Sequence, residues 1–149
     1  MENKVIIGDV NLFAIKIEPL DVVGNLIYGS VDIFIEGDSV LRVKYNDYTI
    51  NSIVAELKCN FRSELSVRDL GKVCVKEIDF HALSEDRVVY IPTGELWDCG
   101  LSLYLGFDGA EERLFYSNDF EETIFEKRLP KGTTQKVILS IPDYGKKLG

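Results

Sequence analysis

The sequence has few of the residues that carry enzyme chemistry. His81 is the single histidine, and no GxSxG-type nucleophile elbow accompanies it. A Ser/His or Cys/His nucleophilic pair would have to use this side chain, and a lone histidine is more often structural or at the surface. The motifs GxGxxG and GxxxxGKS/T are also missing, so nothing supports dinucleotide or P-loop phosphate binding.

Cysteine is scarce as well. Cys59, Cys74 and Cys99 are an odd number and lie far apart in the sequence, which argues against a disulfide framework and against a zinc site. We therefore expect three buried free thiols.

No hydrophobic run approaches the roughly 18 residues of a membrane span. The first residues, MENKVIIGDVNLF, lack the apolar centre and cleavage site of a signal peptide, so we expect a cytoplasmic protein. With 149 residues, of which 46% are hydrophobic and 28% charged, and with no repeat or linker, the chain is expected to form one domain over residues 1–149.

Alternating hydrophobic residues predict strands in the first third of the chain. Phe13, Ile15 and Ile17 share one face of a strand that Pro19 should end. The same alternation in LIYGSVDIFIEGDSVLRV predicts a hairpin, in which Gly37-Asp38 turns the chain into a second strand at Val40–Val43.

One helix is clearly indicated. Ile50, Ile53, Val54 and Leu57 form a single helical stripe, and its N-terminal cap is expected from one of Asn46, Asp47 or Thr49. A second, short helical turn is expected in SELSVRDLG, where Ser66 and Asp69 have capping-box spacing and Leu65 can pack on Leu70 as a hydrophobic staple. The following KVCVKEIDFHAL fits a strand or a helix.

The second half again predicts strands. RVVYIP should end at Pro92, and LSLYLGF should pair with RLFYS. A four-residue loop, Asp108-Gly109-Ala110-Glu111, places Leu105 opposite Leu114 and Leu103 opposite Tyr116, which fits a buried face better than a two-residue Asp-Gly turn.

The C-terminal end permits two interpretations. TIFEKRL and QKVILSIP read as strands around a Pro-Lys-Gly turn, whereas Asp119 and Glu122 also have capping-box spacing for a helix. At least seven strand-like runs and one good helix indicate an α+β fold, with a mainly antiparallel sheet and a few helices packed on one side.

Negative charge is concentrated in one segment. From Glu95 to Glu126 there are nine carboxylates and only Arg113 as a base, so this segment carries the whole net charge of −8. Such a charge disfavours nucleic acid and anionic membranes as partners and favours something cationic.

These carboxylates permit several interpretations. A glycosidase-like pair would have to face each other across a cleft, and the segment lacks the ligand spacing of an EF-hand. The acids are either solvated or part of a protein-binding face, and interleaved aromatic residues favour the second. The expected binding residues are the acids Glu111, Glu112, Asp119, Glu121 and Glu122 and the anchors Phe115, Tyr116 and Trp97.

Several short segments resemble the immunity protein 42 family. They are Gly8-Asp9, Phe13-Ala14-Ile15, YGSVDIFIEG (Tyr28–Gly37), RLFYS (Arg113–Ser117) and LPKG (Leu129–Gly132). Members of that family are bacterial antidotes to polymorphic toxins, including those of contact-dependent growth inhibition. The resemblance implies no catalytic residue and no cofactor. It implies a partner, the cognate C-terminal toxin domain, whose basic surface (as in a nuclease) an acidic inhibitor would occlude.

Two other hypotheses remain open at this point. One is a small-ligand-binding or regulatory domain in which the acids only keep the protein soluble. The other is an enzyme that uses His81 with nearby acids such as Asp79, Glu85 or Asp86.

Overall fold

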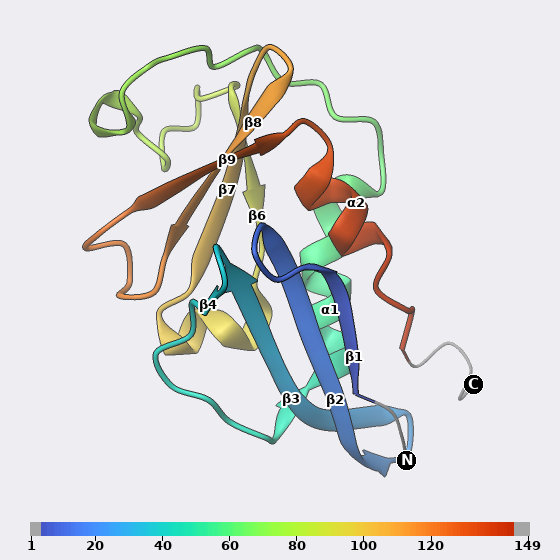
Figure 1. Cartoon of the computed structure of the whole chain (residues 1–149). Coiled ribbons are helices and arrows are strands. Elements are labelled where there is room, and N and C mark those ends of the chain that lie inside the picture. The colour runs from blue at the N-terminus through green and yellow to red at the C-terminus, as the bar shows by residue number, and fades with distance from the viewer. Residues whose placement is uncertain (1–3, 145–149) are drawn as a thin grey trace.

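The computed structural model describes residues 4–144 and contains two antiparallel sheets. The remaining residues of the expected 1–149 domain, 1–3 and 145–149, lie outside the described residues. The fold is α+β, as expected, but the strands divide between two sheets where one was predicted. Figure 1 shows the first half of the chain, in blue and cyan, building one sheet, and the second half, in yellow to red, building the other.

The first sheet has the order β1-β2-β3-β4, and β5 also pairs with β3. Its strands are β1 (Val5–Asp9), β2 (Phe13–Val23), β3 (Leu26–Ile35), β4 (Asp38–Ser39) and β5 (Tyr48–Thr49). The predicted strand at Phe13 is confirmed, and Phe13, Ile15 and Ile17 are fully buried.

Two details of this sheet differ from prediction. Pro19 does not end β2, because the pairing with β3 shifts register between Pro19 and Asp21 and then continues to Val23. Such an irregularity lets a strand accommodate a proline that cannot donate a ladder hydrogen bond. The turn after β3 is Glu36-Gly37, with positive φ at both residues, and the returning strand is only β4; residues 40–43 are not a strand.

The predicted helix is present as α1 (Ile50–Lys58), and its hydrophobic stripe is buried. Thr49 occupies the N-cap position, but its side chain makes no capping hydrogen bond. Instead, the carboxylate of Glu95 accepts a hydrogen bond from the backbone N–H of Thr49 at 2.7 Å. A residue 46 positions away thus orders the start of α1.

The second sheet has the order β6-β7-β8-β9. Its strands are β6 (Val88–Ile91), β7 (Ser102–Asp108), β8 (Glu111–Ser117) and β9 (Phe125–Pro130). The predicted register of the β7–β8 hairpin is confirmed, because Leu105 pairs with Leu114 and Leu103 pairs with Tyr116. The strand interpretation of TIFEKRL is confirmed by β9, and no helix begins at Asp119, where the chain forms turns and bends. After β9 the chain forms a helix, α2 (Thr133–Leu139), so the predicted strand in QKVILSIP is wrong.

The long segment between α1 and β6 is mostly irregular. Its regular pieces are the short 3-10 helices η1 (Cys59–Phe61) and η2 (Val75–Glu77). The predicted helical turn at Ser66 and Asp69 is wrong: Leu70 is instead anchored by its backbone N–H, which donates to the carbonyl of Phe107 at 2.7 Å. This segment, green in Figure 1, packs Ile78 and Phe80 against Tyr104 and Phe115 of the second sheet.

One hydrophobic cluster joins the two sheets. It combines Ile15 and Ile33 of the first sheet with Leu103 of the second and with Ile53 and Leu57 of α1. Both helices pack against the first sheet and contact each other. A shared core of this kind holds the loops at the ends of the two sheets in a fixed relation.

Candidate protein-binding surface

The predicted site residues do not form one face. Glu111 begins β8, whereas Asp119, Glu121 and Glu122 follow its end at Ser117. A strand of this length separates its two ends by about 20 Å at roughly 3.3 Å per residue. The structure therefore places the acids in two separate groups.

Two of the predicted residues lie inside the protein. Glu112 is fully buried, and its carboxylate accepts hydrogen bonds from the backbone N–H groups of Gly132, at 2.7 Å, and Thr134, at 2.9 Å. It therefore serves the start of α2. Phe115 is also fully buried, in the cluster with Phe80 and Tyr104. Neither side chain is available to a partner in this conformation, which corrects the expectation that they face outward.

The acids at the start of β8 are already matched by bases of the chain. Arg128 donates to Glu111 at 3.0 Å and to Asp108 at 2.9 Å, and Lys72 also pairs with Asp108. The Arg128 guanidinium, aided by Lys72, lowers the pKa of Asp108. This end of the molecule thus carries less free negative charge than its sequence indicates.

Tyr116 is half-buried. Its ring stacks on Phe125, with centroids 5.5 Å apart, and burial raises the pKa of its hydroxyl. Phe125 covers much of the ring, so Phe125, at 45% exposure, presents more apolar surface here.

Trp97 and Phe120, here called the aromatic pair, lie at the other end of β8. Trp97 belongs to the 3-10 helix η3 (Gly94–Cys99), and Phe120 to the loop after β8. Their rings meet edge to face with centroids 5.7 Å apart. Trp97 is 41% and Phe120 57% exposed. Two large aromatic side chains thus remain accessible although each is fixed by the other.

The loop that carries Phe120 is held by hydrogen bonds. Asp119 accepts from the Ser117 hydroxyl at 2.8 Å and from the backbone N–H of Thr123 at 3.0 Å, and both contacts lower the pKa of Asp119, the bond from Thr123 most. The backbone N–H of Phe120 donates to the carbonyl of Gly100 at 3.1 Å. Asn118 donates from its amide to the carbonyl of Val40 at 2.9 Å, which ties the loop to the segment after β4.

This loop also contains backbone strain. Phe120 has φ +59° and Glu121 has φ +68°, in the left-handed region that a bulky residue rarely occupies. Strained positions of this kind persist only when the surrounding structure determines them, and they concentrate at functional sites. Phe120 and Glu121 are therefore candidates for a functional role.

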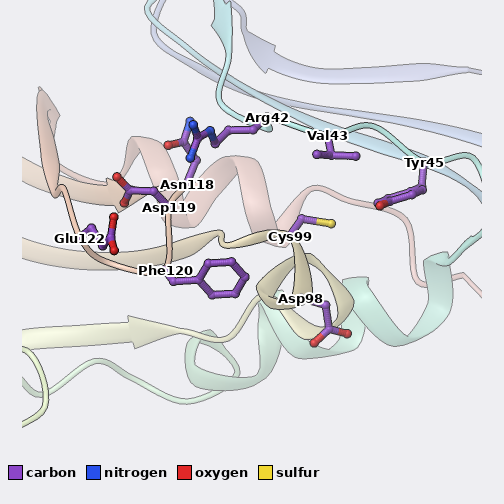
Figure 2. A pocket seen from close by; sticks show the side chains of 9 residues that line it. All are labelled: Arg42, Val43, Tyr45, Asp98, Cys99, Asn118, Asp119, Phe120 and Glu122. Atoms are coloured by element: carbon purple, nitrogen blue, oxygen red, sulfur yellow. The ribbon is translucent and has the colours of Figure 1, made fainter.

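Two hollows adjoin the aromatic pair. The first, called the Asp119 hollow, has a volume of about 630 Å³ and is lined by Arg42, Val43, Tyr45, Asp98, Cys99, Asn118, Asp119, Phe120 and Glu122. Figure 2 shows Phe120 between Asp98 and Cys99 on one side and Asp119 and Glu122 on the other, with Arg42 near Asn118 and Asp119. Val43 and Tyr45, about half exposed, add apolar surface.

The second, called the Tyr104 hollow, has a volume of about 560 Å³. It is lined by Phe80, His81, Ala82, Leu83, Tyr90, Trp97, Tyr104 and Glu121. One oxygen of Glu121 lies 2.7 Å from Nε2 of His81, and the other accepts a hydrogen bond from the Tyr104 hydroxyl at 2.8 Å. Burial and this hydrogen bond raise the pKa of Tyr104 well above its ordinary value.

Four of the eight predicted residues meet around these hollows: Trp97, Asp119, Glu121 and Glu122. Sequence reasoning missed Phe120, Tyr90 and Leu83 as surface residues, although all three are prominently exposed. Phe120 follows an Asn-Asp pair, which is typical of a tight loop, and that was the available signal. Leu83 and Tyr90 carry no comparable signal.

The arrangement offers no catalytic constellation among residues 4–144. Of the acids near His81 in the sequence, Glu85 pairs with Arg87 and Asp86 with Arg68. Asp79 accepts a hydrogen bond from the backbone N–H of His81 at 3.1 Å, not from its ring. No three His, Cys, Asp or Glu side chains of the described chain gather as metal ligands. The prediction of buried thiols is wrong for Cys59 and Cys74, which are exposed.

Within the described part of the chain, no helix is long and apolar enough to cross a bilayer.

Exposed aromatic rings on a hydrogen-bonded loop, with polar groups around them, are the usual centre of a protein interface. The surface made by the aromatic pair and the two hollows therefore fits recognition of another protein better than chemistry.

Comparison with known proteins identifies the fold and the family of the chain. The structure is similar to the crystal structure of CdiI from Burkholderia dolosa AUO158, with a TM-score of 0.65 and 19% sequence identity, over 91% of this chain and 96% of that chain. This likeness shows that the fold is shared. A search of curated proteins gives no match. The model of the family described as "Immunity protein 42" matches residues 5–144. The chain therefore belongs to the immunity protein 42 family.

Proposed function

We propose that this protein is an immunity protein that binds and neutralises the C-terminal toxin domain of a contact-dependent growth inhibition system in the bacterial cytoplasm. It acts by occlusion and not by catalysis. Family membership and the CdiI-like fold support the general role. The observation that carries the proposed surface is the exposed aromatic pair, Trp97 and Phe120, held between two hollows.

The rigidity of the aromatic pair favours tight binding. Ordering a flexible side chain on binding costs about 0.5–1.5 kcal/mol. The contact between the two rings and the hydrogen bonds of the Phe120 loop have already met much of this cost in the free protein. A partner that covers both rings gains the burial of their surface with little loss of freedom.

Charge around the aromatic pair selects the kind of partner. Asp98, Asp119 and Glu122 line the Asp119 hollow, and Arg42 is the only cation among the described residues of this lining. A toxin domain with a basic surface, such as the substrate cleft of a nuclease, complements this rim. Complementary charge accelerates encounter, and the aromatic anchors slow dissociation.

Calorimetric titration tests the proposal, with the C-terminal domain of any large secreted protein encoded beside this gene as ligand. We expect one-to-one binding that weakens as salt rises from about 0.05 to 0.5 M. Trp97→Ala and Phe120→Ala should each weaken binding by at least about tenfold. Phe125→Ala is the matched control, because Phe125 is an aromatic of similar exposure that lines neither hollow.

Charge reversal locates the acidic part of the interface. Three substitutions are compared. Glu122→Lys changes a residue of the Asp119 hollow, and Glu111→Lys changes a residue at the far end of β8. Glu64→Lys changes an exposed residue on a separate loop. We expect Glu122→Lys alone to lower the association rate markedly. If Glu111→Lys has the larger effect and Phe120→Ala none, the interface lies at the other end of the second sheet. Absence of any binding by the wild-type protein would refute the proposed function itself.

A further inference from the structure

We propose that the Tyr104 hollow is a receptor for a single arginine side chain of the toxin domain, which stacks on its aromatic walls and pairs with Glu121. This inference rests on the proposed function, and it names the chemical group that the partner must supply.

The walls of the hollow are aromatic on several sides. Tyr90 and Tyr104 are paired across β6 and β7, with ring centroids 5.4 Å apart. Phe80, from the segment before β6, packs on Tyr104 at 4.6 Å, and the His81 ring lies edge-on to Tyr104 at 6.4 Å. Trp97 completes the lining. Aromatic faces attract a cation within about 6 Å of the ring centre, so the hollow has the walls of a cation-binding site.

Glu121 supplies the charge of the hollow. Its side chain is only 13% exposed, and the Tyr104 hydroxyl and the His81 ring hold its two oxygens in place. Each carboxylate oxygen has a second lone pair, so both can accept a further hydrogen bond. The positive φ of Glu121 directs this side chain into the hollow at the expense of backbone strain.

Among the described residues, Glu121 has no lysine or arginine partner, in contrast to several other half-buried acids of the chain. Arg113 pairs with Glu126, Arg128 with Asp108, and Arg87 with Glu85. Among residues 4–144, neither a lysine nor an arginine pairs with Glu121; its one charged-type neighbour is His81. A carboxylate held in an aromatic hollow without a fixed cation is poised to accept one from outside.

Arginine fits this hollow better than other cationic groups. Its planar guanidinium stacks on aromatic faces and presents a fork of N–H donors to a carboxylate, whereas the lysine ammonium is a compact, strongly hydrated charge. A volume of about 560 Å³ accommodates the long side chain. The wall ring Trp97 also belongs to the aromatic pair, so an arginine bound here would lie at the centre of the proposed interface.

The first test uses the free protein and a small probe. Trp97 is the only tryptophan of the chain and lines the hollow, so its fluorescence reports on occupancy. N-acetyl-arginine amide should change this fluorescence in a saturable way at millimolar concentration, and N-acetyl-lysine amide should bind several-fold more weakly. Glu121→Gln, which keeps the size and shape of the side chain but removes the charge and one acceptor oxygen, should weaken the arginine response by about tenfold, and Glu64→Gln should leave it unchanged.

The second test uses the toxin domain. Glu121→Gln should weaken toxin binding by about tenfold, and one arginine of the toxin, found by Arg→Lys scanning, should have a large effect with the wild-type protein and a small one with Glu121→Gln. Circular dichroism and thermal melting confirm that each variant is folded.

The outcomes separate the two proposals. If Trp97→Ala abolishes toxin binding while Glu121→Gln binds normally and the arginine probe gives no saturable response, the protein is an immunity protein but the arginine receptor is refuted. If the probe binds in a Glu121-dependent manner while no toxin domain binds, the hollow is a guanidinium site and the proposed function fails.

Discussion

The carboxylate of Glu112, on β8, accepts hydrogen bonds from both the backbone N–H and the hydroxyl of Thr134, at the start of α2. It also accepts from the backbone N–H of Gly132. The first N–H groups of a helix have no partner within the helix. A buried acid of the second sheet thus supplies the cap that the residues preceding α2 do not.

Replacement of Glu112 should therefore destabilise the fold. Glu112→Ala leaves the buried N–H groups at the start of α2 without acceptors, and a lost hydrogen bond to a charged group costs about 1.5–3 kcal/mol. We expect the free energy of unfolding, measured in urea, to fall by at least that amount. Hydrogen exchange at the amides of residues 134–139 should accelerate.

Glu111→Ala is the matched control for this change. Its side chain is 54% exposed and pairs with Arg128 on the surface, so we expect a change within about 0.5 kcal/mol. Equal effects of the two substitutions would show that the hydrogen bonds of Glu112 do not stabilise α2.

Gly100 determines the position of the Phe120 loop. It has φ +90°, and a Cβ at this position would lie 2.8 Å from the carbonyl oxygen of Asn118. Gly100→Ala therefore forces the loop away and weakens the hydrogen bond from Phe120 to the Gly100 carbonyl. We expect a loss of roughly 2–4 kcal/mol in the free energy of unfolding, and a change in Trp97 fluorescence because Phe120 contacts its ring.

The loss at Gly100 has two causes, backbone strain and the steric contact with Asn118, and Gly24→Ala separates them. Gly24 also has positive φ, at +61°, but a Cβ at this position would meet no atom within 4 Å beyond its chain neighbours. Its replacement should cost only roughly 1 kcal/mol of backbone strain and leave Trp97 fluorescence unchanged. An equal loss at both positions would mean that the contact with Asn118 is unimportant.

Local patterns predicted the parts of the fold that depend on neighbours in sequence. The β7–β8 register followed from the burial of Leu105 and Leu114 on one face, because a shift of one residue would expose them. The hydrophobic stripe of α1 could likewise be predicted from the helical period alone. The division into two sheets was not predicted, because no local pattern states which hairpins, distant in sequence, join the same sheet.

The candidate site depends on contacts between distant segments, and sequence reasoning failed there for that reason. A charged side chain is usually exposed, so Glu112 was expected at the surface, but its partners lie about twenty residues away at the start of α2. The pairing of Trp97 with Phe120 joins two irregular segments. Only the folded chain brings them together.

Cysteine reactivity tests the packing of Cys99 against Tyr48. Cys59 and Cys74 are exposed, whereas Cys99 is half-buried, with its Sγ 3.2 Å from the Tyr48 hydroxyl. We expect two thiols to react quickly with a disulfide reagent under native conditions and the third to react more slowly. Cys99→Ser should remove the slow phase alone. Three equal rates would contradict the packing of Cys99 against Tyr48.

The pH dependence of stability should reveal the Asp119 hydrogen bonds. The backbone N–H of Thr123 and the hydroxyl of Ser117 lower the pKa of Asp119 in the folded state, whereas in the unfolded chain it returns to about 3.9. Ionised Asp119 therefore stabilises the fold at pH values above the unfolded pKa, and this contribution disappears as pH falls through the lower folded pKa.

The difference in free energy of unfolding between the wild-type protein and Asp119→Asn should be constant from pH 7 to about 5 and shrink below about 4. Urea titrations across this range measure it. Ser117→Ala removes one of the two hydrogen bonds and should leave a smaller pH-dependent part, whereas a difference that does not vary with pH would show that these bonds do not favour the ionised carboxylate.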